Sequence, residues 1–273
     1  MAQTTLARDG GEHAFDLSGF PRSALIPLLA SAYGIGLGLF LAVEPTRPWI
    51  LLAVVLLVGL GADGILRTHP RAQLRGVADT APFLFVPVLL ALAMGLFLEE
   101  IVSGYRTVPA VAGASGLLAA ALYGEYVSAV SHGPSYALGR LLLNVLTYLA
   151  AFAFFAVIYE YDVELLAAAF AIGLFSLLLA VEIFREAEAD AYRALVFSAV
   201  IGVVVAEARW ALYFIPLEGF LAAVLLLLVF YQATGLVQHH LTGHLNRTIA
   251  AEFSAVTLIG VTVVILGRVL SIG

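Results

Sequence analysis

Nine stretches of about twenty apolar residues follow one another between Ser23 and Ile272, joined by short polar links. A helix rises 1.5 Å per residue, so roughly 20 residues cross the ~30 Å hydrocarbon core of a bilayer. The chain is 62% hydrophobic and only 12% charged, and in water it would expose too much apolar surface. We therefore expect an all-α polytopic transmembrane helix bundle of about nine spans. The expected spans are 23–43, 48–66, 79–98, 107–130, 136–159, 163–184, 191–214, 216–237 and 249–271.

The links between these spans are too short to hold a second folded unit. We expect a single transmembrane helical domain over residues 23–273. Residues 1–22 are polar and contain glycine, which predicts a mobile cytoplasmic segment. They lack the basic start and the A-x-A-like cleavage site of a secretory signal, so the first span is expected to remain in the protein.

The placement of arginine predicts the orientation of the bundle. All 13 basic residues are arginine. With the N-terminus inside, nine of them lie on the inner side and four on the outer side, as the positive-inside rule favours. Trp49 and Trp210 then lie near the outer interface, where aromatic belts form. We expect a multi-pass protein of the cell (inner) membrane with a cytoplasmic N-terminus and a C-terminus outside.

Three evenly spaced tyrosines are compatible with an internal repeat. Tyr105, Tyr159 and Tyr213 are 54 residues apart, and each falls at an outer hairpin tip. Tandem helical hairpins would produce this spacing. Tyrosines at the interfaces of hairpins that merely have equal length would produce it as well.

Composition excludes several classes of chemistry. The chain has no cysteine and no lysine, so thiol catalysis, Schiff-base chemistry and a P-loop are impossible. The H-E-x-x-H, G-x-S-x-G and Walker A motifs are also missing. The net charge of −6 lies mostly in loops and gives no reason to expect a nucleic-acid partner. The bilayer is the expected partner, with other membrane subunits as further candidates.

Glu125 lies about one helical turn inside the inner end of its span. Charges inside hydrocarbon are costly and mark candidate sites. We expect Glu125 to pair with Arg140 across the short connection between two spans. The alternatives are a carboxylate that reaches the interface and a protonated, proton-linked acid.

Glu207 and Arg209 form the most informative pair. They are about 200° apart around a helix and therefore face opposite sides. We expect Arg209 to reach Glu218 across a hairpin, and Glu207 to face the interior, near Asn144 or Tyr148 of another span. Glu207 is then either a proton- or cation-sensitive site or a structural hydrogen-bonding group.

Other charged residues near the inner boundary predict local pairs. Asp63 and Arg67 are spaced i,i+4 on one helix face. The run from Glu182 through Arg185 to Arg193 is interpreted as a solvated rim.

Three histidines, His239, His240 and His244, lie in one inner loop. If the helix continued, His240 and His244 would share a face, a spacing that suits a divalent metal. The apolar stripe beside them is typical of an interfacial helix, and Gly243 weakens the helix prediction. We expect a helical continuation at the interface, with a metal site as the alternative.

The segment RWALYFIPLEGFLAAVLLLLVFYQATGLVQHHLTGHLNRTIAAEF belongs to the last third of the chain. It resembles a type of multi-pass bacterial membrane protein known only as a domain of unknown function. The resemblance implies a helical membrane fold and no activity.

Two functional hypotheses follow from the residues. The first is a non-enzymatic membrane protein, either a small permease or an accessory or scaffold subunit of a membrane complex. The second is a membrane-embedded metal-dependent enzyme that uses the histidine group. A polar cavity at Glu207 would favour a permease, whereas a lipid-facing Glu207 beside a dry interior would favour a scaffold.

Overall fold

The computed structural model describes residues 24–69, 77–130, 135–161, 163–187, 190–215, 217, 219–243 and 246–271. Within these ranges the chain forms nine long helices, one short 3-10 helix and no strand. All nine are long and apolar enough to cross a membrane, which confirms the expected all-α bundle. The predicted segment 1–22 lies outside the described residues. The elements are α1 (Leu25–Ala42), α2 (Pro48–Arg67), α3 (Val77–Ile101), η3 (Gly104–Arg106), α4 (Thr107–Ser128), α5 (Tyr136–Glu160), α6 (Leu165–Ala187), α7 (Ala191–Leu212), α8 (Gly219–Leu241) and α9 (Arg247–Ser271).

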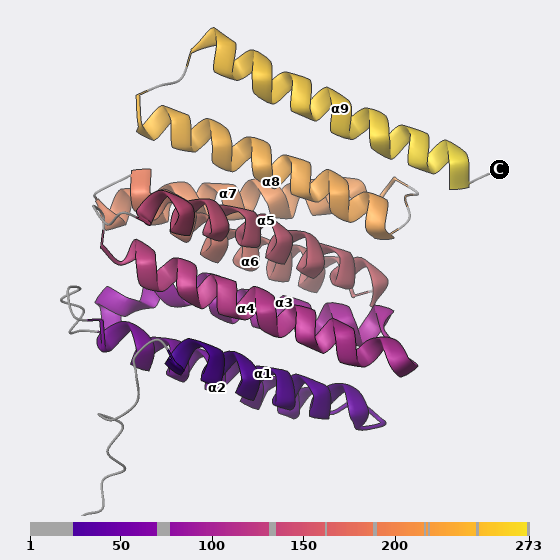
Figure 1. Ribbon diagram of the computed structural model, residues 1–273. Helices are drawn as coiled ribbons and strands as arrows, with labels where there is room; N and C mark the ends of the chain where they lie inside the picture. The colour runs from indigo at the N-terminus through magenta and orange to yellow at the C-terminus, as the bar shows by residue number, and fades with distance from the viewer. Residues whose placement is uncertain are drawn as a thin grey trace, which may run out of the picture.

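The helices run side by side in alternating directions, so the bundle has two ends (Figure 1). We call the end where α1 begins the first face; α2, α4, α6 and α8 end there. The opposite end, where α1 stops and α9 stops, is the second face. The sequence predicts that the first face is cytoplasmic.

Local chemistry sets several helix ends. Pro48 opens α2, where its missing N–H is not needed. The side chain of Asp190 caps α7 by accepting a 3.0 Å hydrogen bond from the backbone N–H of Tyr192. Gly243 has a φ of +71° just after α8, a left-handed conformation that favours glycine and ends the helix.

α5 is the central helix of the bundle. It packs against α3, α4, α6 and α8, and 61% of its span is buried. Figure 1 places α1 and α2 at one edge and α9 at the other. α9 packs chiefly against α8, and only 6% of its span is buried.

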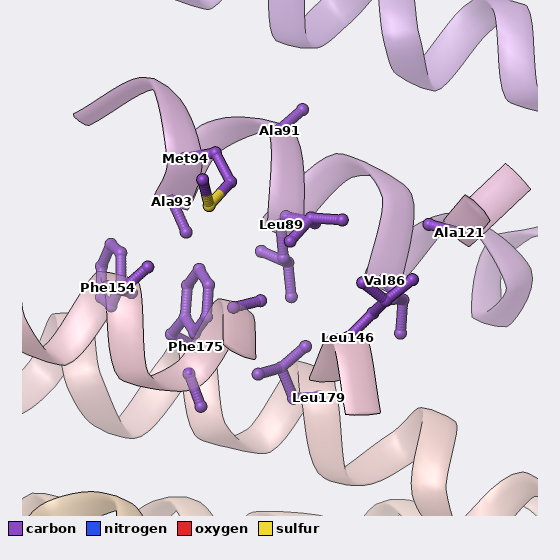
Figure 2. Close-up of a cluster of buried hydrophobic side chains, with 14 of the residues drawn as sticks. Val86, Leu89, Ala91, Ala93, Met94, Ala121, Leu146, Phe154, Phe175 and Leu179 are labelled. Atoms are coloured by element: carbon purple, nitrogen blue, oxygen red, sulfur yellow. The ribbon is translucent and has the colours of Figure 1, made fainter. Parts of the chain in front are cut away.

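The interior between α3, α5 and α6 is filled with apolar side chains. The rings of Phe154 and Phe175 stack with centroids 4.0 Å apart, beside Met94 and Ala93 (Figure 2). Leu179 is completely buried in the same cluster. This part of the bundle is therefore a packed apolar core.

Two pairs of glycines bring helices into close contact. A Cβ atom on Gly202 of α7 would lie 2.7 Å from the carbonyl oxygen of Gly173 on α6. A Cβ atom on Gly124 of α4 would lie 3.2 Å from the carbonyl oxygen of Gly139 on α5. Small residues at such crossings allow backbone-to-backbone packing, which favours helix association in lipid.

Candidate functional site

Four charged side chains meet inside the bundle near the first face. The close approach of Gly124 and Gly139 brings Glu125 of α4 near Arg140 of α5. α6 contributes Glu182 and Arg185, which are one helical turn apart. We call Glu125, Arg140, Glu182 and Arg185 the charge cluster.

Glu182 is the centre of the charge cluster. Its Oε1 atom accepts hydrogen bonds from Nη1 of Arg140 at 2.6 Å and from Nη2 of Arg185 at 2.7 Å. The Nη2 atom of Arg185 also lies 3.1 Å from Oε2 of Glu125. These contacts tie α4, α5 and α6 together at one level of the bundle.

The charge cluster is almost fully enclosed. The side chains of Glu125 and Glu182 are each 1% exposed. The Arg185 guanidinium lies 3.7 Å from the ring centroid of Phe83 on α3, in a cation–π arrangement. Two carboxylates face two guanidinium groups, so the four charges balance, as buried ions require.

Several polar atoms of the cluster lack a hydrogen-bond partner. They are Oε1 of Glu125, Oε2 of Glu182 and Nη1 of Arg185. Because buried polar groups nearly always have partners, the two carboxylate oxygens could each accept a further hydrogen bond, and Nη1 of Arg185 could donate one.

The predicted pairing within this cluster was wrong in detail. Glu125 contacts Arg185 instead of Arg140, and Arg140 contacts Glu182. The run that includes Glu182 was interpreted as a solvated rim, yet Glu182 is buried, because α6 packs against α3 and α5. The order of the chain brings α4 next to α5, but it does not reveal that α6 supplies the opposing charges.

A smaller polar group lies beside the cluster. Arg67 and Asp63 form the predicted i,i+4 ion pair at 2.6 Å. Thr80 of α3 also donates a 2.7 Å hydrogen bond to Asp63. The ring of His69 lies 4.5 Å from that of Tyr126, the neighbour of Glu125.

Arg209 lies inside the bundle near the second face. Its side chain belongs to the buried set at 4% exposure. The guanidinium lies 4.2 Å from the ring centroid of Tyr159 and 5.8 Å from that of Tyr213. Glu218, its predicted partner, is outside the described residues, so that pairing stays a prediction.

A second polar contact at this face joins α3 to the end of α5. The hydroxyl of Tyr161 donates a 2.8 Å hydrogen bond to Oε2 of Glu99. Burial raises the pKa of the Tyr161 phenol, and the adjacent Glu99 carboxylate raises it further.

Glu207 does not face the interior, which corrects the prediction. It is exposed on the outer side of α7 and lines an apolar groove of about 510 Å³ between α6 and α7. Glu207 and Arg209 point to opposite sides of α7, as their spacing predicts. Arg209 is the residue that faces inward, because it lies on the same face of α7 as Gly202, which contacts α6. Of the two expected partners, Tyr148 hydrogen-bonds to Thr234 at 3.2 Å, and Asn144 is half-buried in α5.

The predicted helical continuation is confirmed for His239 and His240, which lie in the last turn of α8. α8 ends at Leu241, and the backbone turns at Gly243. The ring of His239 lies 5.7 Å from that of Phe253 on α9, whereas the ring of His240 lies 6.4 Å from that of Phe197 on α7.

These two histidines thus face different helices. His244 is outside the described residues. Within the part of the chain that the structure describes, no three histidine or acidic side chains gather as metal ligands would.

Comparison with known proteins places this arrangement in a family. Residues 36–267 match the family described as "Protein of unknown function (DUF5656)". The chain belongs to this family. The match runs from within α1 almost to the end of α9, well beyond the last third in which the sequence resemblance was noticed. No curated protein and no solved structure matches.

The charge cluster and Arg209 therefore lie inside the region that matches DUF5656. Sequence reasoning singled out Glu125, Glu207 and Arg209 from their depth in apolar spans. It missed Glu182 because acids and arginines alternate around that position, a pattern that usually marks a helix end in water. The signal that could have found it is the i,i+3 spacing of Glu182 and Arg185 at the end of an otherwise apolar helix.

Proposed function

We propose that the chain is a non-enzymatic accessory subunit that binds a partner protein inside the bilayer along the α6–α7 groove. The observation that carries this proposal is the position of Glu207. Its carboxylate lies on the outer side of the bundle, five residues before the end of α7, or about 7.5 Å along the helix.

The surroundings of Glu207 are apolar. The groove is lined by Leu166, Phe170, Val203 and Trp210 among others. It continues past Gly173 and Gly202 into a second hollow of about 250 Å³. Lipid chains cannot hydrogen-bond to a carboxylate, and a charge at this kind of position is expensive unless another group satisfies it.

A transmembrane helix of a partner protein would satisfy both features. Its apolar side chains would fill the groove, and a hydrogen-bond donor on it would pair with Glu207. Polar residues that hydrogen-bond across helices contribute to association in membranes.

The packed interior supports a subunit more than a permease. Glu207 lies on the side of α7 that faces away from Arg209 and from the apolar core seen in Figure 2. A solute path through the bundle would therefore not pass Glu207. The metal-enzyme alternative has less support, because His239 and His240 contact different helices.

Site-specific photocrosslinking in native membranes tests the proposal. A photoreactive residue at Val203, which is exposed in the groove, should form one protein adduct of defined mass. Glu207→Leu should abolish that adduct. The matched control is a probe at Leu60 of α2, which is also exposed but lies at the edge of the bundle formed by α1 and α2 (Figure 1).

The proposal is wrong if the Val203 probe couples only to lipid, as the Leu60 probe is expected to do. An adduct that persists unchanged in Glu207→Leu would equally exclude Glu207 as the anchor. A stability measurement supports the interpretation: Glu207→Leu should leave the purified chain at least as stable as the parent, because no described interior contact is lost.

A further inference from the structure

Arg209 is a buried cation whose bonding is incomplete. Its side chain is 4% exposed, and it lies three residues before the end of α7. The Nε and Nη1 atoms are both buried and have no hydrogen-bond partner. An arginine cannot lose its proton in a protein, so it keeps its charge and its donors wherever it lies.

The aromatic rings around Arg209 do not complete that bonding. Tyr159 and Tyr213 offer ring faces at 4.2 Å and 5.8 Å, which attract the cation without accepting its N–H groups in the usual way. The hydroxyl of Tyr159 is itself buried without a partner. Two guanidinium nitrogens and one phenol thus present free donors in one place.

The two arginines of the charge cluster, in contrast, have carboxylate partners. Arg140 contacts Glu182, and Arg185 contacts both Glu182 and Glu125. Within the described ranges, Arg209 forms no ion pair. A buried ion without an opposite charge is strongly unfavourable, so an anionic group beside Arg209 would stabilise the bundle.

We propose that Arg209 and Tyr159 bind an anionic phosphate group that enters from the second face. Such groups accept several charge-assisted hydrogen bonds from a guanidinium at once. Both residues lie in the last turn of their helices, at the second face. This site is separate from the α6–α7 groove and does not depend on a partner subunit.

The anion has two possible sources, a phospholipid headgroup and a free anion in solution. The full chain is placed in nanodiscs of phosphatidylcholine alone or of phosphatidylcholine with phosphatidylglycerol, and its thermal midpoint is measured. In a separate arm, inorganic phosphate is added to the phosphatidylcholine discs against sodium chloride of equal ionic strength. A rise only with phosphatidylglycerol identifies a lipid, and a rise with inorganic phosphate identifies a free anion.

Substitutions test whether the anion-dependent rise in thermal midpoint arises at Arg209 and Tyr159. Arg209→Gln should lose the anion-dependent rise, and Tyr159→Phe, which removes only the hydroxyl, should weaken anion binding several-fold. Arg106→Gln is the matched control, because it removes the same charge from an exposed position near the same face and should keep the rise. If Arg209→Gln does not fold, Tyr159→Phe decides alone, since an unchanged rise in it contradicts the site.

Two other outcomes overturn the proposal. One is an equal rise in the parent and in Arg209→Gln. The other is no rise in either arm. A loss of stability in Glu218→Gln that matches the loss in Arg209→Gln would then show that the chain's own carboxylate neutralises the arginine.

Discussion

Glu182 shows how one side chain can hold three helices at a common level. It accepts hydrogen bonds from Arg140 and Arg185 through the same oxygen, and Arg185 extends the contact to Glu125. Buried ion pairs add little net stability when compared with apolar replacements, but the loss of one partner leaves an uncompensated charge. The cluster therefore specifies the register of α4, α5 and α6 more than it adds to their attraction.

Removal of a single charge from the cluster should be costly. Arg140→Met leaves two buried carboxylates facing one arginine, so we expect the free energy of unfolding to fall by about 3–5 kcal/mol. Thermal or denaturant unfolding of the purified chain in detergent measures the loss. Arg67→Gln, in the more exposed pair with Asp63, is the control and should cost much less.

The double variant Arg140→Met/Glu182→Met separates charge balance from simple packing. It leaves Arg185 paired with Glu125, so it should be more stable than Arg140→Met alone. If the two substitutions instead add their separate losses, the residues are not coupled and the cluster is not an ionic unit.

At the scale of single residues, the sequence predicted which charged side chains lie within the apolar spans, but it did not predict their interaction partners. Glu125 and Arg209 were recognised as buried charges because they lie in apolar spans, and the opposite orientation of Glu207 follows from helical geometry. Which of the two would face inward depends on the α6–α7 crossing at Gly202. A single amino-acid sequence does not show directly which helices become neighbours.

At the scale of elements, the α6–α7 pair is the most extensive helix contact in the described bundle. The carbonyl oxygens of Gly173 and Gly202 lie where side chains would otherwise be. The crossing shapes the groove beside Glu207, since Gly173 and Gly202 both line its second hollow. A substitution at this crossing should therefore alter both the free energy of unfolding of the bundle and the shape of the groove beside Glu207.

Gly202→Ala should destabilise the pair. The new Cβ atom would lie 2.7 Å from the carbonyl oxygen of Gly173 and 3.1 Å from Cβ of Leu177, so the helices must move apart, at a cost of about 1–3 kcal/mol. Gly116→Ala on α4 is the control, because nothing lies within 4 Å of its Cβ position, and it should be neutral or slightly stabilising. Equal thermal midpoints for the two variants would contradict the role of this crossing.

Helix boundaries were the most predictable feature of the elements. Length and apolar composition located all nine spans, because a bilayer demands both. The end of α8 was the exception. The helix extends past the expected end at residue 237, through His239 and His240 to Leu241, and the left-handed φ of +71° at Gly243, already a weak point in the sequence, ends it there.

For the whole molecule, the alternation of nine spans fixes the two ends of the described chain on opposite faces. The arginine bias predicts that the first face is cytoplasmic. A reporter that is active only in the cytoplasm should therefore give no signal when fused to Gly273. The same reporter fused after Ala129, in the α4–α5 connection, should be active, and a strong signal at Gly273 would contradict the predicted orientation.

The position of α9 bears on how the protein is made. Eight helices complete nearly all of their mutual contacts without it, since α9 packs chiefly against α8. Helices leave the ribosome in chain order, and units that emerge first generally fold first. The charge cluster and the α6–α7 crossing can thus assemble while the residues after Leu241 are still being translated, and the last helix then attaches to a finished surface.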